Sequence, residues 1–170
     1  MFLPRASVLI KVCVTVMLAF TVLIAGSVAN PPRSEAARRS RYSFKKVEKC
    51  MLNKINKRRV RHGQSRLNWD RQLGYVARKH AKKMARNGTI FHDDDLGYEI
   101  TRWRALGQNV GEGGGCKKLF QAFWNSLPHR HNILGKWRFV GVGSESRNGR
   151  IFVHHVFEHR LNPGNVYTYP

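Results

Sequence analysis

The stretch RFVGVGSESRNGRIFVHHVF, from Arg138 to Phe157, decides the fold class of this 170-residue chain. Residues 138–143 have the composition of a β-strand, and Asn148-Gly149 is a strong signal for a tight hairpin turn. On the return strand, alternate residues face one side: Ile151, Val153, His155 and Phe157. The C-terminal part of the chain is therefore predicted to form an antiparallel β-hairpin.

Three helices are predicted upstream of the hairpin. The first lies between Phe44 and Gly63, because apolar residues recur there at spacings of three and four. The second follows the sequence LNWD, carries an apolar stripe from Leu73 to Ala85 and ends at Asn87-Gly88. The third covers about residues 117–126. Helices packed on an antiparallel sheet make an α+β fold that is built in layers.

The first 29 residues differ from the rest of the chain. Arg5 and Lys11 precede an apolar run, and Gly26-Ser27-Val28-Ala29 supplies the small residues of a cleavage site. This pattern predicts a signal peptide over residues 1–29, or an N-terminal membrane anchor, a transmembrane helix through residues 12–29, if the segment is retained. In either case the protein is expected to be exported.

The remainder is predicted to hold one domain, over residues 44–160. Residues 30–43 are polar, basic and proline-containing, which is typical of a disordered linker. Residues 161–170 are assigned to a C-terminal tail.

Export bears on the interpretation of the cysteines. Cys13 lies in the predicted signal peptide, which leaves Cys50 and Cys116 in the mature chain. Two thiols in an oxidising compartment suggest one disulfide, and two separate buried thiols are the alternative. Neither cysteine has the spacing of a structural zinc site.

The chain is strongly basic, with 31 Lys and Arg against 10 Asp and Glu and a net charge of +21. A surface of this kind attracts polyanions. No RNA- or DNA-reading motif accompanies the basic residues, so no specific nucleic acid recognition is expected. In an exported protein the expected partners are anionic envelope polymers or lipids. We expect the protein to be a monomer.

Seven short stretches carry a more specific signal. The first is INKRRVRHGQSRLNWDRQL, from Ile55 to Leu73, and the others follow in order: KHAKKMARNG, Phe91-His92, LGQNVGEGG, FWNSLPHRHNIL, FVGVGSE and IFVHHVF. In order and spacing they resemble the short bacterial type of the CAP domain. This domain, also called SCP, occurs in cysteine-rich secretory proteins, antigen 5 and pathogenesis-related 1 proteins. The resemblance covers about residues 44–160. It implies an α-β-α sandwich with a cleft that holds two histidines and acidic residues.

The resemblance also assigns residues to the cleft. By motif, His92 and His129 are the two histidines, with Gln108 and Asn109 between them in the sequence. Gln108 stands where the family has a glutamate. An amide supplies neither a general base nor negative charge for a metal, so we assign no catalytic residue. Glu112 would take over this role only if its loop folded back.

A metal site is the second interpretation of the same cleft. His92 and His129 offer two imidazole nitrogens, and an aspartate of the run Asp93–Asp95 would offer an oxygen. Because Gln108 removes a negative charge, we expect zinc to bind only weakly. We expect Gln108→Glu to strengthen that binding at least about tenfold.

The stretch SLPHRHNILGKW, from Ser126 to Trp137, is interpreted mainly as a joint between the third helix and the hairpin. Arg130 and Asn132 are expected to bond to backbone groups there. Ile133 and Leu134 are expected to fill the core, whereas His131 is expected to be exposed.

Two other features look less like sites. The run Gly111–Gly115 lacks the flanking order of a phosphate-binding loop and is interpreted as a flexible rim of the cleft. His154 and His155 are adjacent on a strand and must face opposite sides, so they cannot chelate together. We expect His155 to approach the cleft and His154 to point away from it.

These observations predict a secreted or cell-envelope protein that binds a lipid or another envelope ligand in a histidine-containing cleft. The lipid is an expectation that rests on the resemblance alone. A metal-assisted hydrolase that uses the same cleft is one alternative. A basic protein that binds polyanions through its surface is the other.

Overall fold

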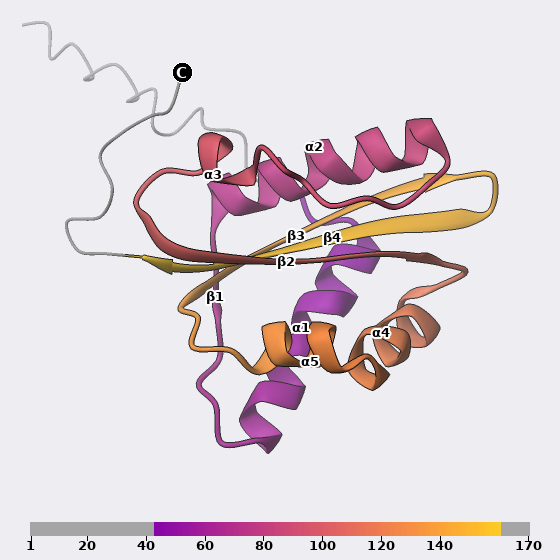
Figure 1. Cartoon of the computed structure of the whole chain (residues 1–170). Coiled ribbons are helices and arrows are strands. Elements are labelled where there is room, and N and C mark those ends of the chain that lie inside the picture. Colours follow the sequence, from indigo (N-terminus) through magenta and orange to yellow (C-terminus); the bar gives the residue numbers. More distant parts are fainter. Residues whose placement is uncertain (1–42, 161–170) are drawn as a thin grey trace, which may run out of the picture. The chain divides into compact units, whose positions relative to one another are not determined.

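The computed structural model describes residues 43–160, shown in colour in Figure 1. In chain order the elements are α1 (Lys46–Arg61), β1 (Asn68–Trp69), α2 (Arg71–Asn87), α3 (Leu96–Glu99), β2 (Trp103–Gly113), α4 (Cys116–Asn125), α5 (Leu127–Leu134), β3 (Phe139–Arg147) and β4 (Arg150–Arg160). The predicted signal peptide or anchor, almost all of the linker and the tail lie outside the described residues. None of the helices between residues 43 and 160 has the length and apolar character that a membrane span requires.

The strands form one sheet in the order β1-β3-β4-β2. β3 and β4 are the predicted hairpin, and its turn has positive φ at both Asn148 (50°) and Gly149 (72°). Tight hairpin turns require this conformation, which Asn and Gly tolerate best. β2 pairs antiparallel with β4, whereas the two-residue β1 runs parallel to β3. The sheet is therefore antiparallel apart from β1, and β2 is an outer strand.

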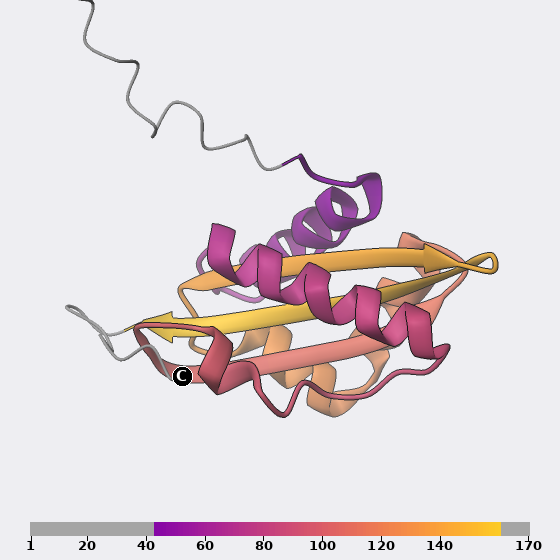
Figure 2. The same cartoon turned by 90° about the horizontal axis from the view of Figure 1, so that it is seen from above.

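α2 lies across one face of the sheet, as Figure 2 shows from above. Two glycines of β3 allow the helix to approach very closely. A Cβ atom at Gly141 would lie 2.2 Å from the carbonyl carbon of Leu73, and one at Gly143 would lie 2.1 Å from that of Ala77. The backbone of α2 therefore rests directly on the strand, and any side chain at these two positions would force them apart.

Both ends of α2 follow the predicted signals. The side chain of Asp70 caps the first turn, where its Oδ1 accepts a hydrogen bond from the backbone N–H of Leu73 at 3.1 Å. Gly88 has a φ of 71° and ends the helix in the left-handed conformation. Gly63 adopts the same conformation just after α1.

The opposite face of the sheet is covered by α1, α4 and α5 (Figure 1). One apolar core fills the space between these helices and the strands. Its most buried members are Met51, Ile55, Phe123, Ile133, Val140, Val142, Val153 and Phe157. Helices on both faces of one sheet confirm the predicted α-β-α sandwich.

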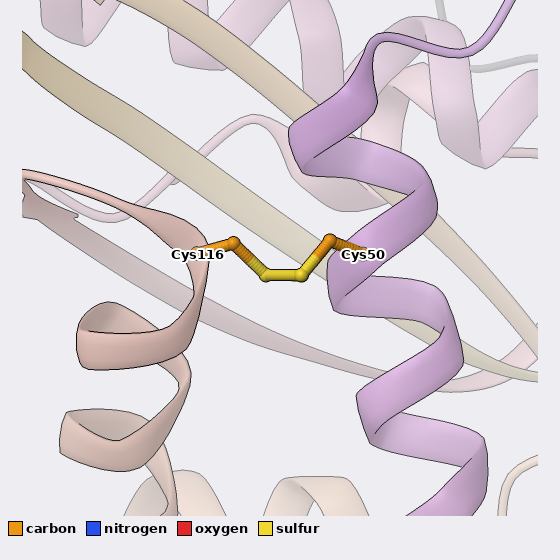
Figure 3. The surroundings of a disulfide bond; sticks show 2 residues. All are labelled: Cys50 and Cys116. Atoms are coloured by element: carbon orange, nitrogen blue, oxygen red, sulfur yellow. A yellow bond between two sulfur atoms is a disulfide. The ribbon is translucent and has the colours of Figure 1, made fainter.

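The predicted disulfide is present and joins α1 to the first residue of α4 (Figure 3). Cys50 and Cys116 lie 66 residues apart in sequence, with their Cα atoms 6.4 Å apart. The alternative of two separate thiols is therefore wrong. In the chain-entropy model a closed loop of this length stabilises a fold by roughly 3–5 kcal/mol.

Two segments differ from the sequence prediction. The expected joint after the third helix is itself mostly a helix, α5, which has Pro128 in its first turn and ends at Gly135. Within it Ile133 is fully buried, Leu134 packs at the edge of the core and His131 is exposed, as expected. The predicted flexible rim is also partly wrong. Gly111–Gly113 belong to β2 and pair with β4, and the ring of Phe123 occupies the space that a side chain at Gly111 would need.

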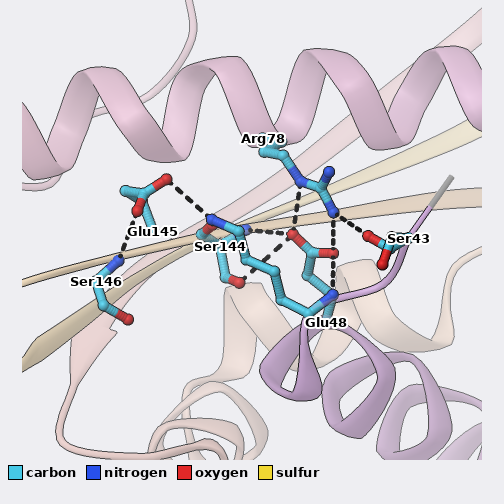
Figure 4. A network of polar contacts seen from close by, with 7 residues as sticks. Ser43, Glu48, Arg78, Ser144, Glu145 and Ser146 are labelled. Carbon is cyan, nitrogen blue, oxygen red and sulfur yellow. Dashed lines mark hydrogen bonds and ion pairs between the residues drawn. The ribbon is translucent and has the colours of Figure 1, made fainter.

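A buried carboxylate ties α1 to α2 at the β3 edge of the sheet (Figure 4). Glu48 is fully buried and bonds to Arg78 through both of its oxygens, at 2.9 and 2.5 Å. It also accepts the backbone N–H groups of Ser144 (3.2 Å) and Lys45 (3.0 Å). Because β1 pairs with only the first two residues of β3, the carboxylate supplies the acceptor that a longer neighbouring strand would have offered.

Candidate functional site

The predicted cleft residues gather around β2, the outer strand of the sheet. Gln108 and Asn109 are neighbours on this strand and therefore point to opposite faces. Gln108 points to the α2 face, and Asn109 points to the face covered by α4 and α5. The candidate site is thus divided by the strand into two groups of polar side chains.

On the α2 face, the side chain of Gln108 pairs with the backbone of the loop that precedes α3. Its Oε1 accepts the N–H of Asp93 at 3.0 Å, and its Nε2 donates to the carbonyl of the same residue at 3.1 Å. The Nε2 of His154 lies 3.0 Å from the same Oε1, so this nitrogen donates the proton. His154, which strand alternation predicted to point away from the cleft, thus contacts a predicted cleft residue.

A second histidine, His80 on α2, lies beside this group. Its ring centre is 4.7 Å from that of His154. Its Nε2 is 2.7 Å from the carbonyl oxygen of Phe91, and a carbonyl only accepts, so Nε2 carries a proton. Its Nδ1 is 3.5 Å from Oδ2 of Asp93. The charge of this buried pair therefore depends on one proton, held by the imidazole or by the carboxyl group.

His80 was not identified from the sequence, although a signal was present. It lies on the buried stripe of α2, four residues after Val76 and four before Met84. A histidine among apolar residues must find polar partners or remain neutral. Sequence spacing alone does not reveal that the partner is Asp93, because the partner lies on a loop.

Burial shifts the pKa values of Asp93 and His154 so that the uncharged form of each side chain is favoured. Burial raises the pKa of Asp93, and the neighbouring His80 partly opposes that shift. The pKa of His154 lies well below its ordinary value because of burial, followed by the charges of His80, His155 and His92. Burial thus opposes the charged form of the carboxyl group of Asp93 and of the imidazole of His154.

On the other face, two asparagines join β2 to α5. The Nδ2 of Asn132 donates to the backbone oxygen of Gln108 and to Oδ1 of Asn109, each at 2.9 Å. The Nδ2 of Asn109 donates to the backbone oxygen of His129 at 3.1 Å, and Trp137 donates to the backbone oxygen of Asn132 at 2.7 Å. Asn132 therefore bonds to backbone as predicted, and these amides fix the position of α5 against the strand.

Arg130 takes a different position from the one expected. Its guanidinium lies over the ring of Trp124, 5.9 Å from the centroid. Within residues 43–160 this side chain is placed by an aromatic face and not by a hydrogen bond to backbone.

His129 lies near two other histidines. It is partly buried against the ring of Phe123, with ring centres 5.1 Å apart in an edge-to-face arrangement. Burial lowers its pKa, and the charge of the exposed His92 lowers it further. His155 is fully buried on the same face, and burial together with the charge of His129 lowers its pKa to about 3. Neither ring nitrogen of His155 has a hydrogen-bond partner among residues 43–160.

His92 connects the two faces. It is exposed, and its charge lowers the pKa of His129 on one side of the strand and of His154 on the other. The two motif histidines are therefore within electrostatic reach of each other. The imidazole of His129 is neutral when the pH is above its lowered pKa.

The acidic residues near the site are engaged elsewhere. The carboxylate of Glu112 bonds to Arg150, so it does not take the place of the family glutamate at Gln108. Asp94 and Asp95 are exposed. A hollow of about 200 Å³ opens over the His80–Asp93 pair, and its wall includes Glu99. Within residues 43–160, no group of three His, Cys, Asp or Glu side chains is arranged to hold a metal ion.

Comparison with known proteins agrees with this architecture. The family model of the cysteine-rich secretory proteins, CAP, matches residues 52–157. An outer surface protein from Borrelia burgdorferi has a similar structure, with a TM-score of 0.64 and 18% identity over 70% of this chain and 96% of that one. A search of the curated proteins found no match.

Two other similar structures come from larger proteins. An extracellular protein with an SCP domain from Bacillus anthracis has a TM-score of 0.61 and 26% identity over 67% of this chain. A cysteine-rich secretory protein from Staphylococcus aureus has a TM-score of 0.57 and 21% identity over 67% of this chain. The matched part is only 40% and 39% of those two chains, respectively. At these identities the Borrelia and Staphylococcus proteins show a shared fold alone.

Proposed function

Because the chain belongs to the cysteine-rich secretory protein (CAP) family, we propose that it is an exported protein that binds an envelope ligand at the β2 edge. The ligand contacts His92 and His129 and is not hydrolysed. The ligand is a lipid or another envelope molecule. It carries a polar group, either uncharged or anionic, that accepts a hydrogen bond from an imidazole.

Export is supported by three independent features. The first 29 residues have the composition of a signal peptide or anchor. The disulfide is of a kind that persists in oxidising compartments. Two proteins of similar structure are described as an outer surface protein and an extracellular protein.

Binding without hydrolysis is supported above all by the hydrogen bonds that the Gln108 amide makes to other residues of the protein. Its amide oxygen accepts from the N–H of Asp93 and from His154, and its nitrogen donates to the carbonyl of Asp93, so this position offers a substrate no general base. The one buried carboxyl group nearby, that of Asp93, faces His80 instead. Zinc hydrolases commonly hold the metal with three protein ligands, whereas the motifs assign only two imidazoles, His92 and His129, to this cleft.

The test is native mass spectrometry of the protein purified from its own host. The wild type is expected to carry a small molecule that is absent from His92→Ala and His129→Ala. The matched control is His131→Ala, which removes an exposed imidazole two residues from His129 on the same helix and should keep the ligand. A ligand retained by both cleft variants would contradict the assignment of the site.

The alternative function is a metal-assisted hydrolase. Ester or peptide hydrolysis that a chelator abolishes, and that is lost in His92→Ala but kept in His131→Ala, would establish it in place of the binding protein. The same assay on wild-type protein without added metal gives the baseline.

A further inference from the structure

A second polar region lies away from β2, in a groove between α1 and α4. The groove has a volume of about 150 Å³, and five cationic side chains line it. Lys54, Lys57, Arg58 and Arg61 come from α1, and Lys117 comes from α4. No acidic side chain lines it.

No acidic side chain of residues 43–160 forms an ion pair with the cations of this groove. Glu48 is the only acidic residue of α1, α4 and α5, and it is fully buried against Arg78. On α1 the four groove cations are three and four residues apart, the spacing at which like charges repel on a helix. Such an arrangement costs stability in the isolated protein. A bound anion would remove that cost.

The groove is also preorganised. The Cys50–Cys116 disulfide fixes α1 against the start of α4 (Figure 3). The Nζ of Lys54 lies 5.6 Å from the ring centre of Phe120, and the guanidinium of Arg58 lies 4.5 Å from that of Trp124. These aromatic faces hold the two side chains in place, so less conformational freedom is lost when an anion binds.

The shape of the groove indicates which anion it accepts. From Lys54 to Arg61 the row of cations extends about 10 Å along the helix, at 1.5 Å per residue, so it is longer than one phosphate group. Stacking of nucleic acid bases needs open aromatic faces, whereas Phe120 and Trp124 are buried beneath cations. Attachment to a bilayer needs apolar side chains that project beside the cations, and the only apolar residue that lines this groove, Phe120, is buried.

We propose that the α1–α4 groove binds a linear phosphate-bearing polymer through successive phosphate groups and without reading bases. This site shares no residue with the β2 edge and does not depend on the function proposed for it.

The experiment compares two triple variants of the full-length exported chain, with linear inorganic polyphosphate as the probe. The groove variant is Lys57→Gln/Arg61→Gln/Lys117→Gln, which changes three exposed cations. The control is Lys82→Gln/Arg86→Gln/Arg104→Gln, which removes the same charge from exposed positions on α2 and β2. Thermal melting and a non-reducing gel check that each variant is folded with its disulfide intact.

The groove variant is expected to bind polyphosphate at least about tenfold more weakly than the wild type. Its plot of log affinity against log salt should be less steep by about 2, at about 0.7 for each lost phosphate contact of a single chain. The control should keep the affinity of the wild type. Equal losses in the two variants would overturn the proposal, because binding would then follow net charge alone.

Two further arms separate other occupants. Phosphatidylglycerol vesicles bound through the groove cations, with no binding of polyphosphate, would overturn the proposal in favour of a membrane surface. Single-stranded DNA bound more tightly than polyphosphate in a groove-dependent way would overturn it in favour of nucleic acid. If the groove variant melts early, Lys57→Arg/Arg61→Lys/Lys117→Arg keeps the charge and must keep the affinity, and its failure would also count against the proposal.

Discussion

Each edge of the sheet holds one buried carboxyl group, and the two are neutralised in different ways. At the β3 edge, Glu48 faces Arg78, which stays charged at any ordinary pH. At the β2 edge, Asp93 faces the imidazole of His80, which, unlike a guanidinium, is charged only when both of its ring nitrogens carry protons. The first arrangement is fixed and serves the fold. The second can change its charge, and it lies beside the motif histidines, so the comparison identifies β2 as the edge where chemistry can be controlled.

The largest expected effect tests the fixed edge. Glu48→Gln keeps the shape of the side chain but removes the charge that neutralises Arg78. Breaking a buried ion pair commonly costs 3–5 kcal/mol, and because Arg78 keeps some exposure we expect a loss of about 3 kcal/mol in the free energy of unfolding. Urea denaturation at neutral pH measures it.

The matched control is the same change at the other edge, Asp93→Asn. Because the proton of the His80–Asp93 pair can rest on either partner, we expect a smaller loss, about 1 kcal/mol. Equal losses at the two edges would remove the distinction between a fixed and a responsive carboxyl group.

The next effect concerns the asparagines that hold α5 on β2. Asn132→Ala removes the donor to the backbone of Gln108 and to the side chain of Asn109. We expect a loss of about 1–3 kcal/mol, with ligand affinity nearly unchanged in the folded protein. His131→Ala, at the exposed neighbouring position, should melt like the wild type. A variant that melts normally but no longer binds ligand would move Asn132 from the scaffold to the site.

Much of the fold could be predicted because its signals are local. The Asn148-Gly149 turn, the Asp70 cap and the apolar periods of α1, α2 and α4 each depend on residues close in sequence. β2 could not be predicted from its own residues, since its three glycines and two adjacent amides leave no alternation of apolar and polar side chains. It is a strand because β4 supplies its hydrogen-bond partners, and Gly111 leaves room for the ring of Phe123 to pack against it.

The candidate site likewise contains residues that could be predicted from the sequence and residues that could not. His92, His129 and Gln108 follow from motifs, whereas the His80–Asp93 pair depends on contacts between a helix and a loop. The role of His154 was missed for a related reason. Alternation correctly separates it from His155, but the sequence does not show that Gln108 reaches its face of the strand.

The third prediction concerns pH. His155 has a pKa of about 3 in the folded protein, against about 6.5 in the unfolded chain. As the pH falls below about 6.5, His155 therefore becomes protonated in the unfolded chain but stays neutral in the native protein. The free energy of unfolding then decreases by about 1.4 kcal/mol per pH unit for this group. The depressed pKa of His154 acts in the same direction, and the raised pKa of Asp93 partly opposes both at lower pH.

His155→Leu isolates this contribution, because it replaces the ring with an apolar side chain of similar volume. Between about pH 7 and pH 5 the variant should lose about 2 kcal/mol less than the wild type in urea denaturation. His131→Ala should keep the pH dependence of the wild type. An unchanged slope in His155→Leu would mean that this ring titrates normally in the native protein.

The smallest expected effect returns to the carboxyl group that the β2 edge lacks. Gln108→Glu places a negative charge next to neutral imidazoles on a strongly basic protein, where a divalent ion is otherwise disfavoured. We expect weak zinc binding by the wild type and at least about tenfold tighter binding by the variant, about 1.4 kcal/mol, in a calorimetric titration.

The substitution also removes the donor to the backbone oxygen of Asp93, so the variant should melt at a lower temperature without zinc and recover part of that loss when zinc is added. Adding His92→Ala to the variant should remove the gain, because His92 is the motif histidine whose charge reaches the α2 face, to which the side chain at position 108 points. Tight zinc binding by the wild type that is lost in His129→Ala would reverse the comparison, because the β2 edge would then already be a complete metal site and hydrolysis would become the better-supported function.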